Sequence, residues 1–464
     1  MRLLKAHVNR LFLAYGLLTG VLAFVIAFTA SSGGDPVSQF AWMTALSIIA
    51  AGVLVVIARL WTTTAVYAAV FWCFHFGLVA AVAVRYLPTI DLALTEEGWV
   101  VGPFAAEAAR LALAGLLAFA SGASLVHASR RRAEALPHQV THPYGPVGSV
   151  LVFVAIASWC VVVVIAGGVS GFFASYETFR DMIAPYSLPI SIISPTLACG
   201  IVIAFTGKAG WHRTAAIVAF ASFALIALPI GLRTDVMFPI VAVIVALARC
   251  GRAFSPLKAA ALGLGLLFLI PVVKEVRNTG LSAVPDALSA PRLDALVEMG
   301  GSLRPVEQVV RWHAEGDPYL LGGSYWAPFE RAASRLLPDL RSTAADDDLR
   351  LMNVLVMDRI GAIGFSPVAE AYRNFGALGV VMVMALIGIG LAAVDTIRDP
   401  RRAVLAIAVF YPPLLINIRN SFVAVPVQCL AGIALLLAVA ALRHMLDGMM
   451  TRPYANSSYI RSQI

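Results

Sequence analysis

The sequence predicts an all-helical protein that crosses a membrane many times. Of its 464 residues, 60% are hydrophobic and only 13% are charged, and the mean hydropathy of +0.85 lies outside the range of soluble domains. Apolar runs of about 17–22 residues recur along the chain, and at about 1.5 Å per residue this length matches a hydrocarbon core about 30 Å thick. Because backbone groups cannot hydrogen-bond to lipid, each run that crosses must be a helix.

We predict about twelve membrane-spanning helices, nine before and three after one long interruption. Two of them, 235–248 and 403–417, are short enough to be tilted differently or partly re-entrant. In chain order, the predicted spans are 11–30, 41–58, 63–84, 105–126, 147–167, 188–205, 214–230, 235–248, 258–273, 376–394, 403–417 and 422–442.

The placement of Lys and Arg predicts the orientation of these spans. Arg2, Lys5 and Arg10 precede the first span, which places the N-terminus in the cytoplasm, and the loops that would then face the cytoplasm are all basic. An even number of spans returns the C-terminus to the same side. The net charge of +8 therefore reflects membrane topology, and we expect the protein to contact membrane lipid and no nucleic acid.

Neither a cofactor nor a metal ion is expected from the motifs of the chain. The sequence has no Gly-x-x-x-x-Gly-Lys phosphate loop, which argues against ATP-driven transport. Its five cysteines lie in predicted spans or at a cytoplasmic end, so they indicate small core residues and neither a zinc site nor a disulfide framework.

The long interruption is a mixed-charge insert rich in Trp, Tyr, Pro and Gly. Three stretches within it, 302–313, 329–337 and 366–375, read as short helices at the outer leaflet, two of them amphipathic at helical spacing. Transporters and channels rarely carry such an insert, whereas an enzyme working at the membrane surface needs one. The predicted parts are spans one to nine at 1–273, the extracytoplasmic loop at 274–375, spans ten to twelve at 376–442 and a cytoplasmic tail at 443–464.

Several cations fall on the predicted outer side, against the usual charge rule. Arg233 and Arg419 occupy short hairpins, and Lys274 and Arg277 follow the ninth span. Each could reach the interface alone or pair locally, for example with Asp235. Four cations on one face also predict a phosphate site, because guanidinium binds phosphate through two parallel hydrogen bonds and stays charged.

The insert offers further candidates for chemistry. Arg304, Glu307 and Arg311 share one stripe of the predicted helix 302–313, and His313 lies on its apolar stripe, where a packing role is the simpler interpretation. Aromatic side chains of the insert could stack on sugar rings or form an interfacial belt; they are Trp312, Tyr325 and Trp326. The run 346–348 of three aspartates could bind a divalent ion, although its polar surroundings are typical of an exposed loop.

The stretch 361–379 supplies a motif. It contains a Gly-x-Ser step at 364–366 and then Glu-x-Tyr-x-Asn-Phe-Gly at 370–376 at the start of a span. Together with the late external loop, the Gly-x-Arg of 231–233 and the Gly-Gly-Ser of 322–324, this motif resembles the Wzy-type polymerases of oligosaccharide repeat units. The Glu-x-Tyr-x-Asn-Phe-Gly element is the most specific part of the resemblance.

The resemblance implies an enzyme at the outer face of a bacterial plasma membrane. Such polymerases transfer a growing chain from its polyprenyl-pyrophosphate carrier onto an incoming lipid-linked oligosaccharide, with inversion at the transferred sugar and without nucleotide sugars or metal. A co-polymerase that sets chain length is an expected partner.

That reaction needs cations where charge grows on the departing pyrophosphate and a base near the acceptor hydroxyl. We expect Glu307 or Glu370 to be the base, with His313 as a further candidate; Glu370 could instead brace the insert through Arg373. The remaining candidates are expected to bind the substrate or its pyrophosphate: Arg233, Lys274, Arg277, Arg304, Arg311, Arg419, Tyr372 and Asn374.

Two other functions compete with the polymerase. An O-antigen ligase would move the finished glycan to a different acceptor with similar arginines and a loop histidine, a role that His313 could fill. A flippase for lipid-linked oligosaccharides would need charged residues along a path inside the spans and short loops on both sides. The few intramembrane charges, such as Glu107 and Arg110, and the very unequal loops argue against the flippase.

Overall fold

The computed structural model describes residues 2–29, 36–87, 98–129, 140–255, 257–258, 261, 265, 294–336, 347–361 and 363–450. Within these ranges every named element is a helix, which agrees with the predicted all-helical class. Nine described helices are long and apolar enough to cross a membrane, and each corresponds to a predicted span. The predicted span 235–248 is a shorter helix, 403–417 is a helix with polar residues and two prolines, and 258–273 lies almost wholly outside the described residues. The total of twelve stays a prediction.

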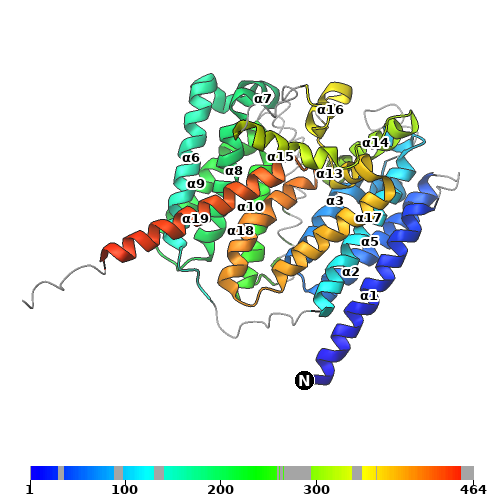
Figure 1. Ribbon diagram of the computed structural model, residues 1–464, viewed down its shortest axis with the longest axis horizontal. Coiled ribbons are helices and arrows are strands. Elements are labelled where there is room, and N and C mark those ends of the chain that lie inside the picture. The colour runs from blue at the N-terminus through cyan, green and yellow to red at the C-terminus, as the bar shows by residue number, and fades with distance from the viewer. Residues whose placement is uncertain are drawn as a thin grey trace, which may run out of the picture.

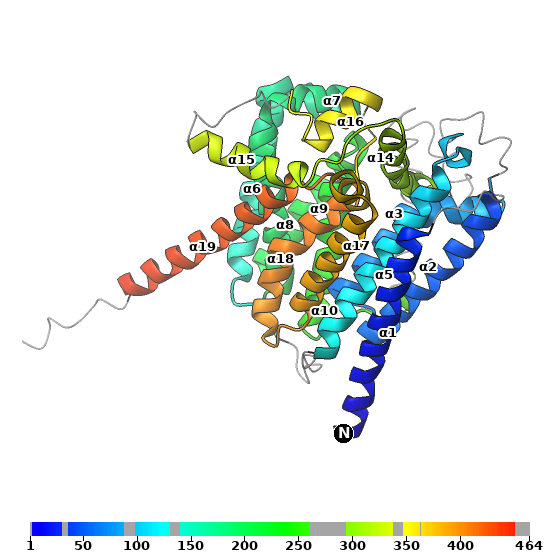
Figure 2. The same ribbon diagram turned by 45° about the vertical axis from the view of Figure 1, so that its right-hand side comes forward.

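The long helices form two groups that lie side by side in Figures 1 and 2. One group packs around α5, which contacts α1 and α17 extensively, while α2 and α3 pack together beside it. It comprises α1 (Arg2–Phe28), α2 (Pro36–Ala58), α3 (Thr63–Ala83), α5 (Ala105–Ser129) and α17 (Pro367–Asp395). The second group packs around α8. It comprises α6 (Gly145–Gly167), α8 (Ser187–Thr206), α9 (Trp211–Ile230), α10 (Arg233–Arg249), α18 (Pro400–Asn417) and α19 (Ala424–Met450).

Glycines allow the central helices to approach closely. A Cβ atom at Gly122 of α5 would lie 2.3 Å from the carbonyl oxygen of Ala385 in α17, and one at Gly388 would lie 2.2 Å from that of Phe119. Helices in lipid gain little from hydrophobic burial against each other, so small residues that permit backbone contact are a main source of their association. Glycine on both α5 and α17 therefore fixes the centre of the first group.

The short helices gather at one end of the bundle, away from the N-terminus (Figures 1 and 2). They are α7 (Tyr176–Ile183), α13 (Asp294–Gly300), α14 (Arg304–Ala314), α15 (Gly323–Leu336) and α16 (Met352–Ile360). Short 3-10 turns accompany the helices at Gly98–Val101, Val169–Phe173, Ala184–Tyr186 and Gly301–Leu303. Helices therefore form at the predicted amphipathic stretch 302–313 and at residues 329–336 of the predicted stretch 329–337, whose last residue lies outside the described residues.

The helix α17 joins this end to the membrane-spanning part. Phe375 and Gly376 interrupt it with non-helical backbone, at φ −139° and +64°. The residues before the break belong with the short helices, and those after it form the long apolar part. The change from insert to span that the sequence predicts at 375–376 lies at this break.

Candidate active site

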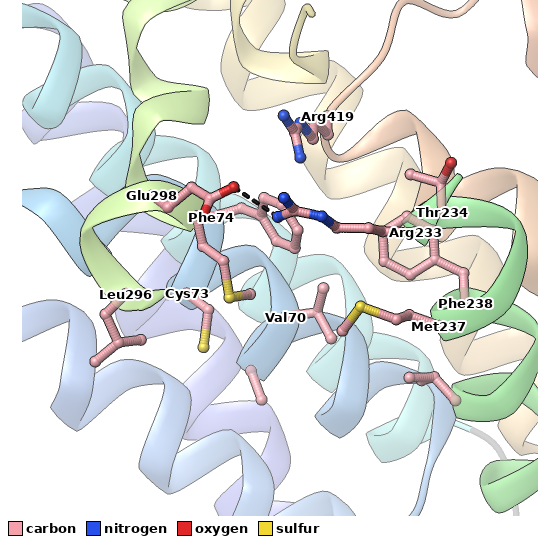
Figure 3. A pocket seen from close by; sticks show the side chains of 13 residues that line it. Val70, Cys73, Phe74, Arg233, Thr234, Met237, Phe238, Leu296, Glu298 and Arg419 are labelled. Atoms are coloured by element: carbon pink, nitrogen blue, oxygen red, sulfur yellow. Dashed lines mark hydrogen bonds and ion pairs between the residues drawn. The ribbon is translucent and has the colours of Figure 1, made fainter. Parts of the chain in front are cut away.

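A cavity of about 290 Å³ lies where the two helix groups meet, at the end that carries the short helices (Figure 3). Most of its wall is apolar, so the charged side chains that border it stand in a setting that favours strong electrostatic contacts. Its lining comes from α3 (Ala69, Val70, Cys73, Phe74), α10 (Arg233, Thr234, Met237, Phe238, Val241), α13 (Leu296, Glu298, Met299) and the turn before α19 (Arg419).

Arg233 is the first residue of α10 and reaches into the cavity. The preceding helix ends at Gly231, whose φ of +100° is readily adopted only by glycine, and the chain turns within two residues into α10. Nη1 of Arg233 donates to Oε1 of Glu298 at 2.6 Å. The side chain is 11% exposed, yet its Nε and Nη2 have no hydrogen-bond partner among the described residues.

Glu298 is held at the opposite wall by the packing of α13 on α3. A Cβ atom at Gly77 of α3 would lie 2.2 Å from the carbonyl oxygen of Leu296, and one at Gly300 would lie 2.0 Å from the backbone nitrogen of Leu78. Only glycine fits at these two positions, so the backbones of α13 and α3 touch. The position of Glu298 is therefore set by the helix backbone.

Arg419 lies in the turn between α18 and α19 and borders the cavity with Arg233 (Figure 3). Its carbonyl oxygen accepts a hydrogen bond from the backbone N–H of Phe365 at 2.9 Å. Gly364, at φ +77°, makes this contact possible, because a Cβ atom there would lie 2.7 Å from the same oxygen. The segment before α17 thus holds the turn that carries Arg419.

Glu370 holds the same turn at a second point. This side chain is fully buried, and its Oε2 accepts the backbone N–H of Phe422 at 2.6 Å while its Oε1 accepts the hydroxyl of Ser324 at 2.7 Å. Glu370 does not border the cavity. Its hydrogen bonds run to Ser324 and Phe422 and not to Arg373, and its role as base or as brace stays a prediction.

The neighbours of Glu370 on α17 also face the insert. Asn374 accepts the backbone N–H of Gly322 at 3.0 Å and donates to the Ser324 hydroxyl at 2.7 Å. Arg373 forms an ion pair with Asp317 at 3.0 Å. Tyr372 meets the rings of His313 and Tyr319 edge-on, at centroid distances of 6.0 and 6.1 Å. The Glu-x-Tyr-x-Asn element of the motif therefore contacts the insert.

The charged stripe of α14 lies apart from the cavity. Glu307 is fully buried and accepts from Nη2 of Arg311 at 2.6 Å and from Nε2 of Gln308 at 2.9 Å. Burial raises the pKa of the Glu307 carboxyl above its ordinary range, although Arg311 beside it and Arg304 act in the opposite direction. The guanidinium of Arg311 also lies 5.8 Å from the centre of the Phe104 ring.

His313 is engaged within the insert. Its ring stacks on Tyr319 at 4.1 Å, and its Nδ1 donates to the carbonyl oxygen of Asp317 at 3.0 Å. These contacts lie within the insert, and the role of His313 stays a prediction.

The aspartate run is only partly described. Asp348 pairs with Arg350 at 2.9 Å, and these hydrogen bonds hold the pKa of the Asp348 carboxyl below its usual range. Within the described residues, no three His, Cys, Asp or Glu side chains lie close enough together to hold a metal ion. Lys274, Arg277 and Asp346 lie outside the described residues.

The structure thus brings together Arg233 and Arg419 at one cavity, which Arg304, Glu307 and Arg311 of α14 and Glu370 of α17 do not border. Sequence reasoning missed Glu298. The available signal was an acid between Leu296 and Met299 in an otherwise apolar turn, and nothing in its spacing connects it with an arginine 65 residues earlier.

Comparisons with known proteins complete this description. The chain matches the family described as O-antigen polysaccharide polymerase Wzy over residues 17–448. It is also similar to Protein CapE of Staphylococcus aureus, with 27% identity over 231 residues, which is 50% of this chain and 51% of that protein. The match therefore spans about half the length of this curated relative. No solved structure matches the chain.

Proposed function

Since the chain belongs to the O-antigen polysaccharide polymerase Wzy family, we propose that it joins oligosaccharide repeat units carried on polyprenyl pyrophosphate. The protein is a multi-pass bacterial membrane protein. The reaction would take place at the outer face of the plasma membrane, with both termini in the cytoplasm, and the growing chain would pass from its carrier to the incoming unit with inversion at the transferred sugar.

One observation supports this proposal most: two arginines border a cavity with a mostly apolar wall where the two helix groups meet. A polyprenyl pyrophosphate combines a charged head with an apolar tail. The apolar wall suits the first isoprene units, and a guanidinium can bind a phosphate oxygen pair through two parallel hydrogen bonds. Arg233 has two N–H groups without a partner in the described part of the chain, so it can accept such a ligand without breaking other contacts of these groups.

The two arginines would also assist the reaction itself. As the sugar leaves its carrier, negative charge grows on the pyrophosphate oxygens, and fixed cations in an apolar site stabilise that charge without having to reorganise. Arg419 is held from the backbone by Phe365 and, through Phe422, by Glu370. Preorganised guanidinium groups of this kind would supply the charge stabilisation of a metal-independent enzyme.

Reconstitution tests the proposal. Full-length protein in vesicles is supplied with a polyprenyl-pyrophosphate-linked oligosaccharide, and the products are separated by size with and without a chelator. We expect a ladder of polymers in both conditions. Transbilayer movement of the lipid without a ladder would contradict the proposal in favour of a flippase, and transfer that requires a different acceptor would do so in favour of a ligase.

A matched pair of substitutions locates the site in the same assay. Arg233→Lys keeps the charge but removes the fork, and we expect polymer formation to fall by about 100-fold, as for the loss of one preorganised donor. Arg180→Lys makes the same change on α7, where Arg180 forms an exposed ion pair with its neighbour Asp181, and should leave the yield unchanged. Equal yields from both variants would remove Arg233 from the site.

A further inference from the structure

Glu298 is an acid in a place where the proposed ligand is an anion. The charged side chains that border the cavity are Arg233, Arg419 and Glu298. A permanent carboxylate would repel the pyrophosphate and weaken its binding. A carboxylate at this position is therefore expected to have a function in the reaction. The role assigned to Glu298 rests on the proposed function.

The contact between Glu298 and Arg233 occupies one edge of the guanidinium. Nη1 donates to Oε1 of Glu298 at 2.6 Å, while Nε and Nη2 have no partner among the described residues. An anion that takes these two groups would lie beside Glu298, and like charges at short range in an apolar cavity repel strongly. Binding of a pyrophosphate would therefore loosen the carboxylate from Arg233.

The loosened carboxylate would stay at the cavity. Its helix backbone is fixed on α3 through Gly77 and Gly300, so only the side chain of Glu298 is free to respond. That side chain is 19% exposed and points across the cavity toward Arg233 (Figure 3). In contrast, Glu307 and Glu370 are fully buried, and both oxygens of each accept hydrogen bonds within the protein.

We propose that Glu298 is the catalytic base, held by Nη1 of Arg233 before the donor binds and released when the donor pyrophosphate binds Nε and Nη2 of the same guanidinium. The freed carboxylate accepts the proton of the acceptor hydroxyl as that oxygen bonds to the anomeric carbon of the donor sugar. The bond between this carbon and the phosphate oxygen breaks, and its electron pair leaves with the pyrophosphate, which Arg233 and Arg419 hold. Glu298 then passes its proton to water.

Such a base would be available only after the donor has bound. While Glu298 is paired with Arg233, its Oε1 accepts the hydrogen bond from Nη1, so this oxygen does not accept the proton of an acceptor hydroxyl. Arrival of the donor places an anion beside Glu298 and frees this oxygen.

The substitution Glu298→Gln tests the proposal with two measurements on the full-length protein. Gln keeps the shape but neither accepts the proton nor repels an anion. We expect polymer formation to fall by about 100-fold or more, in the range of general-base catalysis. We also expect farnesyl diphosphate, used as a binding probe in detergent, to bind severalfold more tightly. Glu330→Gln serves as the control, because Glu330 forms a surface pair with Arg350 at the same end, and should change neither quantity.

The outcomes separate this proposal from the one before it. Polymer formation by Glu298→Gln within about threefold of wild type would show that the base is elsewhere, and weaker probe binding would show that Glu298 only positions Arg233. Either result leaves the pyrophosphate site intact.

If Arg233→Gln and Arg419→Gln bind the probe as well as wild type, the proposed pyrophosphate site itself is wrong. Should Glu298→Gln fold poorly, Glu298→Asp keeps the carboxylate and should retain measurable activity; complete loss in a folded Asp variant would overturn the proposal.

Discussion

The cavity and the Glu370 brace lie at the same end of the molecule, and both combine buried charge with polar contacts. They differ in how completely their polar groups are paired. Glu370 uses both oxygens, and Asn374 uses its oxygen and its nitrogen, all within the protein. Arg233 leaves two buried N–H groups unpaired, whereas the other arginines of the described residues with unpaired buried nitrogens leave only Nε.

This difference separates two uses of buried charge. An unpaired buried donor costs about 1–3 kcal/mol, so a protein that keeps two on one side chain gives up stability that a ligand can restore. A fully paired carboxylate stabilises the fold and has nothing left to offer a substrate. The comparison predicts that changes at the cavity affect activity and changes at the brace affect stability.

The largest expected effect is that of Arg233→Gln. We expect polymer formation to fall by about 100- to 1000-fold, because one preorganised donor to the growing charge is worth that much. The melting temperature should stay within a few degrees of wild type, because the loss of the ion pair with Glu298 is offset by the removal of buried donors that have no partner in the described residues. Activity in vesicles and thermal melting in detergent check the two parts. A fall in melting temperature that parallels the loss of activity would make Arg233 a part of the scaffold.

The next effect is that of Glu370→Ala. This change leaves the Ser324 hydroxyl and the Phe422 N–H buried without their partner, and we expect a loss of about 3 kcal/mol in the free energy of unfolding. The turn that carries Arg419 would also lose one of its two attachments. Thermal melting of the purified protein measures the loss.

Glu370→Gln then decides between a brace and a base. A Gln side chain can accept the Phe422 N–H and donate to the Ser324 hydroxyl, so a brace should keep polymer formation within about threefold of wild type. A general base would lose about 100-fold or more, since an amide does not accept the proton. The second result would support the sequence prediction that Glu370 is the base, and its complete pairing would then not mark a purely structural role.

The sequence predicts more of the fold than of the site. Long apolar runs encode spans directly, so all nine described span candidates were predicted, and the helical spacing of 302–313 predicted α14. Arg233 and Arg419 were grouped from the predicted topology alone. Their shared cavity, however, depends on how the two helix groups pack against each other. No local pattern in the sequence predicts this packing.

Long-range contacts explain what the sequence could not predict. Glu298 reaches Arg233 because Gly77 and Gly300 let α13 touch α3. Nothing in the sequence distinguishes these two glycines from glycines that make no such backbone contact. Glu370 likewise accepts a backbone N–H, a group that every residue except proline carries, so its partner Phe422 has no signature of its own. Both contacts are products of tertiary packing.

A smaller effect is expected at the support of Glu298. Gly77→Ala would place a Cβ atom 2.2 Å from the carbonyl oxygen of Leu296, so α13 must move away from α3. Overpacking of this kind costs about 1–3 kcal/mol of the free energy of unfolding. The displacement of Glu298 should also raise KM, which the kinetics in vesicles measure. The control is Gly52→Ala in α2, where nothing lies within 4 Å of the added atom. Identical kinetics for the two variants would mean that the contact of α13 with α3 does not position the site.

The smallest effect concerns Glu307, a paired carboxylate whose pKa burial raises above its ordinary value of 4.5. Between that value and the raised pKa, the folded protein holds a proton that the unfolded chain has lost. The contribution of Glu307 to stability is therefore fully present below about pH 4.5 and is lost as pH rises through the raised pKa.

The variant Glu307→Gln is uncharged at every pH and should flatten this loss of stability, which thermal melting at several pH values measures. Glu315→Gln, an exposed change just after the same helix, should leave the pH dependence of wild type. A steeper fall in Glu307→Gln would mean that the ion pair with Arg311 outweighs burial, and Glu307 would then be held as a charged group, closer in kind to Glu298 than to Glu370.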